Sequence, residues 1–125
     1  MITEDYVSFE VAKLLKEKGF DAECDYLYVD GELVRAQGCA CNWNEGESLY
    51  TDYKNECSAP TLQMTMKWLR EEKNIIVNIW YNGVDWDTEY YNNEDEDFYL
   101  ITDTSCNSYE EACEAGIKYC LENLI

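Results

Sequence analysis

Residues 75–104, IIVNIWYNGVDWDTEYYNNEDEDFYLITDT, decide the fold of this chain. Ile75–Tyr81 is apolar apart from one asparagine and has the length of a strand, so it predicts a buried β-strand. Asn82-Gly83 follows directly, and this dipeptide favours the positive φ angles of a two-residue hairpin turn. We therefore expect a hairpin to begin at this strand.

Two further strands are predicted after that turn. Between Val84 and Tyr91, aromatic residues and a threonine alternate with acids, which is typical of a strand with one exposed face. The polar run Asn92–Asp97 favours a turn, and Phe98–Thr104 is again rich in β-prone residues. The whole stretch predicts an antiparallel meander.

Helices are predicted outside this meander. Ser8–Gly19 has a capping serine at its start and a glycine suited to a left-handed residue at its end. Pro60 is expected to open a second helix that Asn74 ends, because proline is tolerated in a first helical turn. Ser108 and Glu111 form a capping-box pattern, which predicts a last helix running to the C-terminus.

The N-terminal half contains a second hairpin signal. Tyr26–Val29 and Glu32–Ala36 are β-prone runs joined by Asp30-Gly31, a dipeptide that accepts positive φ at both turn positions. Residues 37–57 show no regular spacing of apolar residues and predict a long loop, in which a short strand is possible near Leu49–Tyr53. Loops of this length in compact domains are often functional.

These elements predict an α+β fold in the order α-β-β-α-β-β-β-α, with one mostly antiparallel sheet covered on one face by helices. A length of 125 residues predicts a single domain over residues 1–125. The second half has the element order of a double-stranded RNA-binding module. An RNA-binding surface needs cations, however, and this half lacks them.

The charge of the chain excludes some partners. Nine Lys and Arg stand against 27 Asp and Glu, the net charge is −18, and histidine is absent. Direct binding to nucleic acid or to an anionic membrane needs clustered cations, so neither partner is expected. From residue 74 to residue 117 there is no Lys or Arg at all, although eleven acids occur there.

Aromatic residues are interleaved with these acids. Such a surface can complement a basic protein, so we expect a basic protein partner bound through the cation-free block 74–117. The simpler alternative is that the charge serves solubility and that the aromatic residues form the inner face of the sheet. A homodimer formed through sheet edges or aromatic residues is a third possibility, and the sequence leaves the oligomeric state open. The candidate interaction residues are Asp85, Trp86, Asp87, Glu89, Glu94, Asp95, Glu96, Asp97 and Asp103.

Enzymatic or metal chemistry is the weaker alternative. Cys39 and Cys41, together with Cys57 and with Cys24 as a further candidate, could supply thiolates to zinc. Structural zinc sites normally show paired cysteine motifs, however, and one C-x-C occurs here. Carboxylates of the meander, Asp85, Asp87 and Glu89, could bind a divalent cation or act as an acid/base pair, although no calcium-loop pattern surrounds them. No catalytic residue and no cofactor are predicted.

The expected compartment is the cytoplasm. Glu4 and Asp5 stand where a secretory signal would carry basic residues, and no apolar stretch approaches the 18 residues of a membrane span. The seven cysteines are an odd number without a framework spacing, which favours free thiols in a reducing compartment.

Three blocks of the sequence resemble known proteins in their residue order. They are YVSFEVAKLLKEKGF (6–20), SAPTLQMTMKWLREEKNIIV (58–77) and SYEEACEAGIKYCLENLI (108–125). These blocks are similar to a group of short prophage-associated and mobile-element proteins of gut anaerobes whose function is unknown. The resemblance implies a small cytosolic α+β protein and assigns no site residue. We therefore expect a non-enzymatic interaction protein. A narrower hypothesis is a mobile-element accessory protein that mimics nucleic acid and inhibits a basic host protein.

Overall fold

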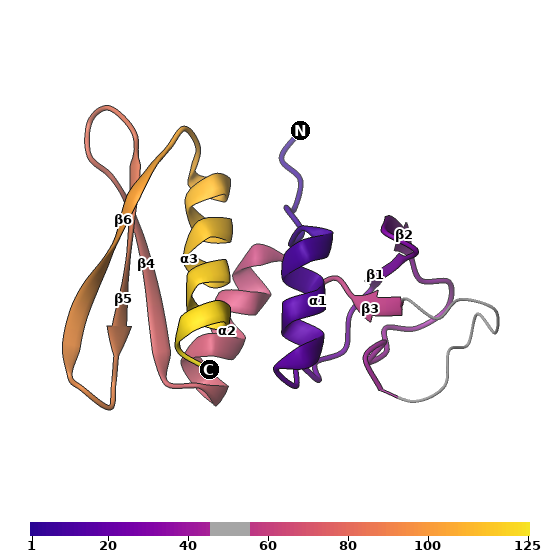
Figure 1. Cartoon of the computed structure of the whole chain (residues 1–125). Helices are drawn as coiled ribbons and strands as arrows, with labels where there is room; N and C mark the ends of the chain where they lie inside the picture. Colours follow the sequence, from indigo (N-terminus) through magenta and orange to yellow (C-terminus); the bar gives the residue numbers. More distant parts are fainter. Residues whose placement is uncertain (46–55) are drawn as a thin grey trace. The chain divides into compact units, whose positions relative to one another are not determined.

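A computed structural model of the chain describes residues 1–45 and 56–125, with the backbone alone described for residues 102–105 (Figure 1). The element order is α-β-β-β-α-β-β-β-α, and the α+β class is confirmed. The six strands form two three-stranded antiparallel sheets, so the expected single sheet is wrong. The chain divides into two compact units, residues 1–61 and 62–125, and the single domain over residues 1–125 stays a prediction.

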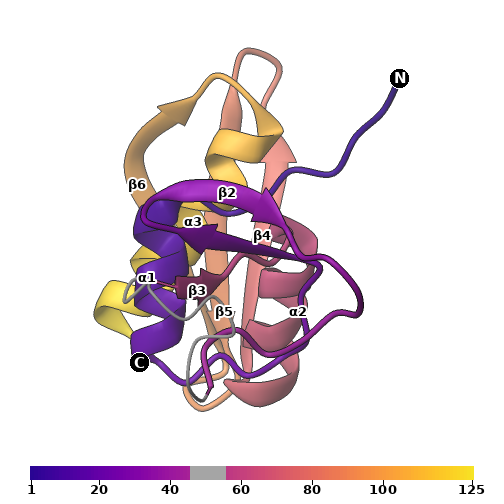
Figure 2. The same cartoon turned by 90° about the vertical axis from the view of Figure 1, so that its right-hand side faces the viewer.

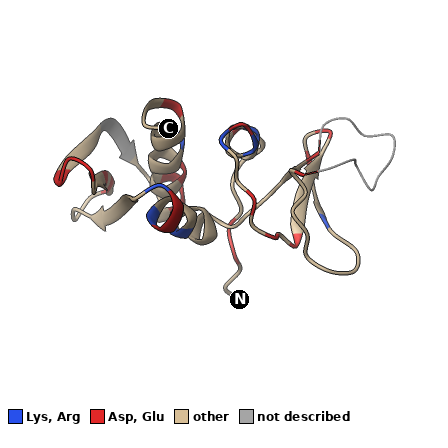
Figure 3. Ribbon diagram, turned by 90° about the horizontal axis from the view of Figure 1, so that it is seen from below, with Lys and Arg blue, Asp and Glu red and all other residues tan. Residues whose placement is uncertain are grey.

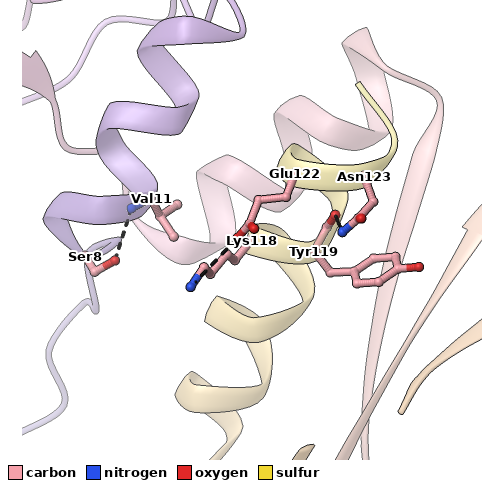
Figure 4. A network of polar contacts seen from close by, with 6 residues as sticks. All are labelled: Ser8, Val11, Lys118, Tyr119, Glu122 and Asn123. Carbon is pink, nitrogen blue, oxygen red and sulfur yellow. Dashed lines mark hydrogen bonds and ion pairs between the residues drawn. The ribbon is translucent and has the colours of Figure 1, made fainter. Parts of the chain in front are cut away.

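The first unit begins with helix α1, Phe9–Glu17. Ser8 caps it as predicted: its Oγ accepts a hydrogen bond of 3.2 Å from the backbone N–H of Val11 (Figure 4). Gly19 has φ +87°, the left-handed conformation expected of the residue that follows a helix. Both ends of this helix are therefore where the sequence predicts them.

Strands β1, Tyr26–Val29, and β2, Glu32–Arg35, form the predicted hairpin. Its two turn residues, Asp30 and Gly31, have φ +50° and +84°, as a type I′ turn requires. A third strand, β3, Glu56–Ser58, pairs with the other edge of β1 and gives the order β2-β1-β3 (Figure 2). The strand considered near Leu49–Tyr53 lies outside the described residues.

Strand β3 falls at the end of the segment that the sequence predicts as a loop. It is only three residues long, too short to show a strand period, but all three residues are buried. Its middle residue, Cys57, lies opposite Tyr28, and the hydroxyl of Tyr28 donates a hydrogen bond of 2.6 Å to the carbonyl of Val7. Phe9 packs against the same tyrosine, with ring centroids 5.4 Å apart. Strand β3 is thus held by tertiary packing rather than by local propensity.

The second unit begins with helix α2, Leu62–Glu72, so the predicted helix start at Pro60 is two residues early. The reason lies in the first unit, where the carbonyl of Pro60 accepts a 3.1 Å hydrogen bond from Val7 and Thr61 forms a β-bridge with Tyr6. This pairing keeps residues 60 and 61 out of the helix. Asn74, at φ +57°, follows the helix, as predicted.

Strands β4, Ile75–Tyr81, β5, Trp86–Asn92, and β6, Asp97–Cys106, form the predicted meander in the order β4-β5-β6. The two-residue turn predicted at Asn82-Gly83 is wrong, because Tyr81 pairs with Trp86 and four residues connect the strands. The side-chain oxygen of Asn82 accepts hydrogen bonds of 2.9 Å from the N–H groups of Val84 and Asp85. These bonds stabilise the longer turn and delay the start of β5.

Helix α3, Tyr109–Asn123, begins with the predicted capping box. The Oγ of Ser108 accepts from the N–H of Glu111 at 3.1 Å, and the carboxylate of Glu111 accepts from the N–H of Asn107, one residue before the cap, at 2.9 Å. Farther along, Lys118 and Glu122 form an i,i+4 ion pair of 3.8 Å (Figure 4). Among the described residues, no helix combines the length and the apolar character needed to cross a bilayer.

Helix α3 contacts all three strands of its sheet, and α2 contacts β4 and α3, on the same side of the sheet (Figure 1). The hydroxyl of Thr88 donates a 3.0 Å hydrogen bond to the carbonyl of Ala112, which ties the middle strand to α3. Val77, Tyr90 and Ile101 are buried on this helix-covered face. One face of this sheet is therefore covered by helices, as expected.

Candidate interaction surface

The other face of this sheet is composed of side chains that alternate with the buried ones. In a strand, successive side chains point to opposite faces, and cross-strand partners share a face. The inward positions are fixed by Thr88, Tyr90 and their buried partners, so the outward positions follow from the strand register. We call this outward surface the open face and define it as Ile76, Asn78, Trp80, Asp87, Glu89, Tyr91, Phe98 and Leu100.

One end of the open face is an apolar row. Ile76 lies opposite Tyr91, and Tyr91 lies opposite Phe98 on the next strand. The rings of Tyr91 and Phe98 have centroids 4.7 Å apart in a tilted arrangement. This contact fixes the two rings beside each other, although 58% of Phe98 stays exposed.

The centre of the open face combines a carboxylate with apolar neighbours. Glu89 lies between Asn78 and Leu100, and the amide of Asn78 donates a 3.5 Å hydrogen bond to Glu89. Leu100 is 57% exposed. Beyond them, Asp87 lies opposite Trp80, which is 37% exposed. Apolar side chains thus surround two acids on a surface that faces water.

The electrostatics of this surface are strongly negative. No Lys or Arg occurs from residue 74 to residue 117 (Figure 3). The carboxylate of Asp87 accepts a 2.8 Å hydrogen bond from the amide of Asn82, and no cation pairs with Asp87 or Glu89 within the part of the chain that the structure describes. The segment that forms the open face therefore supplies no positive charge of its own to offset these two carboxylates.

The predicted interaction residues fall at several places around this sheet. Asp87 and Glu89 lie on the open face, whereas the ring of Trp86 turns to the other side and packs against Tyr81 and Tyr109, at 5.2 and 5.5 Å. Asp85 lies in the turn before β5, where it accepts a hydrogen bond from Asn82. The side chain of Asp103 lies outside the described part. The remaining predicted acids are exposed: Glu94, Asp95 and Glu96 in the turn between β5 and β6, and Asp97 at the start of β6.

Several residues of the open face are missing from the sequence prediction. Strand β4 was expected to be buried, but only Ile75 and Val77 are. No described element of the second unit covers its outward row, so Trp80 is exposed there, and Tyr81, at the far end of the strand, is exposed on the other side. An apolar run without alternation predicts a strand buried on both faces, and a lone asparagine was the one signal that Ile75–Tyr81 has an outward side.

The cysteines do not form a common site. Cys24 and Cys41 form a β-bridge with backbone hydrogen bonds of 2.9 and 3.3 Å. The hydroxyl of Ser58 contacts Cys24, so Cys57, its neighbour on β3, points to the opposite face. Among the described residues, no group of three or more His, Cys, Asp or Glu is placed to share a metal ion. The zinc site considered for Cys39, Cys41 and Cys57 is therefore not assembled.

All seven thiols are free, and five of them are buried. Burial raises the pKa of the Cys24 thiol and of the Cys57 thiol from about 9 to about 11. A thiol with a raised pKa is a poor nucleophile, because the thiolate is the reactive form. The arrangement therefore favours structural cysteines over catalytic ones.

These surroundings predict an order of alkylation. At pH 8 we expect iodoacetamide to modify exposed Cys39 first and half-buried Cys41 next, and to leave Cys57 and Cys120 unmodified until the chain unfolds. Mass spectrometry of digested samples at successive times measures each rate, and the same reaction in urea is the control in which all seven thiols react. Modification of Cys57 as fast as Cys39 would contradict the packing described here.

No protein-family model matches the chain, and no curated protein or solved structure matches it significantly.

Proposed function

We propose that this chain is a non-enzymatic protein-interaction module that binds a basic protein through the open face. The observation that carries the proposal is the exposure of Trp80, Phe98 and Leu100 on a sheet face that also holds two carboxylates. Exposed apolar patches with polar groups around them mark interaction surfaces in soluble proteins. A face that served solubility alone would have no need of large apolar side chains at these three positions.

The surrounding charge selects the class of partner. The block 74–117 carries eleven acids and no cation, so its field attracts a basic surface and repels an acidic one. Two copies of the chain joined through this face would bring Asp87 and Glu89 of both copies into one interface. Like charges at an interface disfavour the wrong partner, so this arrangement supports a basic protein over a second copy.

A sharper form of the proposal is a nucleic-acid-mimicking inhibitor. The acids Glu94–Asp97, in the turn and at the start of β6, are exposed and would present negative charge to a protein surface that normally binds phosphates. The resemblance of three sequence blocks to mobile-element proteins supports an accessory role of this kind. If the chain mimics nucleic acid, DNA and this chain compete for the same site on the partner. A sedimentation experiment in which the partner binds both at once would count against nucleic-acid mimicry.

The proposal places the module in the cytoplasm. Its support is the state of the cysteines: all seven are free, and the five buried ones pack as small apolar side chains.

A photo-crosslinking amino acid placed at Leu100 tests the proposed function. We expect it to capture a basic protein from a lysate of the native host at 50 mM salt, and the yield to fall at least about tenfold at 500 mM salt, because screening weakens charge attraction. The matched control carries the crosslinker at Leu33, which is 42% exposed on β2 of the first unit. The same products from both positions, or none from Leu100, would overturn the proposal.

A further inference from the structure

We infer that the open face receives an arginine side chain of the basic partner at Glu89. This inference rests on the proposed function and specifies the chemistry of the partner. Glu89 occupies the middle of the open face, because β5 is the central strand and Asn78 and Leu100 lie on either side of it. Along the strand, Asp87 and Tyr91 are its neighbours on the same face.

The position of Glu89 requires a cation from any partner that covers the face. A partner that packs on Trp80, Phe98 and Leu100 removes water from the carboxylate between them. A buried carboxylate without a positive partner is strongly destabilising, whereas a well-paired one is tolerated. A wholly apolar partner is therefore rejected, and the interface needs a cation opposite Glu89.

The neighbours of Glu89 favour arginine over lysine. The Asn78 amide donates to one carboxylate oxygen, Oε1, at 3.5 Å, so the carboxylate retains acceptor capacity for the two parallel N–H groups of a guanidinium. The rings of Tyr91 and Phe98, held 4.7 Å apart, lie in the next row and offer surfaces on which a planar guanidinium stacks. Lysine is a compact, strongly hydrated charge that lacks this planar fork.

The acids of the neighbouring turn have a different role. Glu94 and Asp95 are exposed and lie in the turn outside the open face, so their attraction for cations is screened by water and salt. They steer a basic surface toward the sheet, whereas Glu89 holds one side chain in a defined place. Glu94 is therefore the matched control residue for a test at Glu89.

The test titrates the full-length ¹⁵N-labelled chain with N-acetyl-L-arginine amide and follows backbone and tryptophan indole resonances. We expect saturable shifts at Trp80, Glu89 and Tyr91. N-acetyl-L-lysine amide at the same ionic strength should bind at least about fivefold more weakly, because it lacks the guanidinium fork. Glu89→Gln should weaken arginine binding at least about fivefold, whereas Glu94→Gln, which removes the same charge from the exposed turn, should weaken it less than about twofold.

Three outcomes would overturn the inference: no localised shifts, equal binding of the two amides, or equal effects of the two substitutions. Failure of the proposed function is seen separately. A basic protein that crosslinks at Leu100 with undiminished yield in Glu89→Gln would reject the arginine contact and keep the interaction module. No crosslink at Leu100 would reject the module, whatever the arginine titration shows.

Discussion

Gly116→Ala should destabilise the second unit, although alanine normally favours a helix. A Cβ at this position of α3 would lie 2.6 Å from the Cγ2 of Thr88 and 2.8 Å from the Cγ1 of Val77. Both neighbours belong to packed strands and cannot rotate away freely. Overpacking of this kind costs about 1–3 kcal/mol, which exceeds the gain of about 1 kcal/mol from helix propensity. Urea unfolding followed by circular dichroism measures the difference.

A rescue variant separates overpacking from other effects of Gly116→Ala. Thr88→Ser removes the nearer methyl group and keeps the hydroxyl that donates to Ala112. Val77→Ala removes the second close carbon. In this background, Gly116→Ala should cost less than it does in the wild-type chain. An equal or greater cost there, or a stabilising effect in the wild-type chain, would show that α3 does not approach the sheet this closely.

A rise of pH above 9 should strongly lower the free energy of unfolding. Burial raises the pKa of Cys24, Cys57 and Cys113 from about 9 to about 11, and that of Cys120 to about 12. The unfolded chain loses these protons first, so the stability from each buried thiol is full below pH 9 and is lost as the pH rises toward 11 or 12. Each thiol lowers stability by up to about 1.4 kcal/mol per pH unit in this range.

Urea melts between pH 7.5 and 10.5, with a reductant present, measure this loss. Cys120→Ala removes one buried thiol and should reduce the slope of stability against pH, even though the variant is less stable at pH 7.5. Cys39→Ser removes an exposed thiol and should change the slope less than Cys120→Ala does. A slope that is the same in all three proteins would contradict a contribution from buried thiols.

Most of the fold could be predicted from local signals. Asp30-Gly31 and the capping residues Ser8 and Ser108 each specify a backbone geometry with their own side chain or φ angle, and the structure confirms them. The two errors in length have a different origin. Asn82-Gly83 favours a two-residue turn, but the side-chain oxygen of Asn82 accepts hydrogen bonds that stabilise a longer one. Pro60 is kept out of the helix because its carbonyl pairs with the N-terminal segment.

The candidate site could be predicted only in part. Its charge can be read from the sequence, whereas the direction in which each side chain points depends on how the strands pair. The acids of 74–117 are visible in the sequence, and so are their neighbouring aromatic residues. Whether an aromatic residue faces helices or water depends on strand register: Trp86 faces the helix-covered side and Trp80 the open face. Likewise, β3 depends on pairing with a strand almost thirty residues earlier, which no local pattern shows.

Alternate side chains of β5 lie on opposite faces of the sheet, so neighbouring residues are constrained by different things: the fold on one face and the proposed binding on the other. Thr88 and Tyr90 are constrained by α3, through a hydrogen bond to Ala112 and a stacked ring contact with Tyr119. Asp87, Glu89 and Tyr91 project from the same backbone without touching that core. Substitutions at these outward positions therefore carry a low folding cost, and binding preference can evolve on one face of the strand while the other preserves the fold.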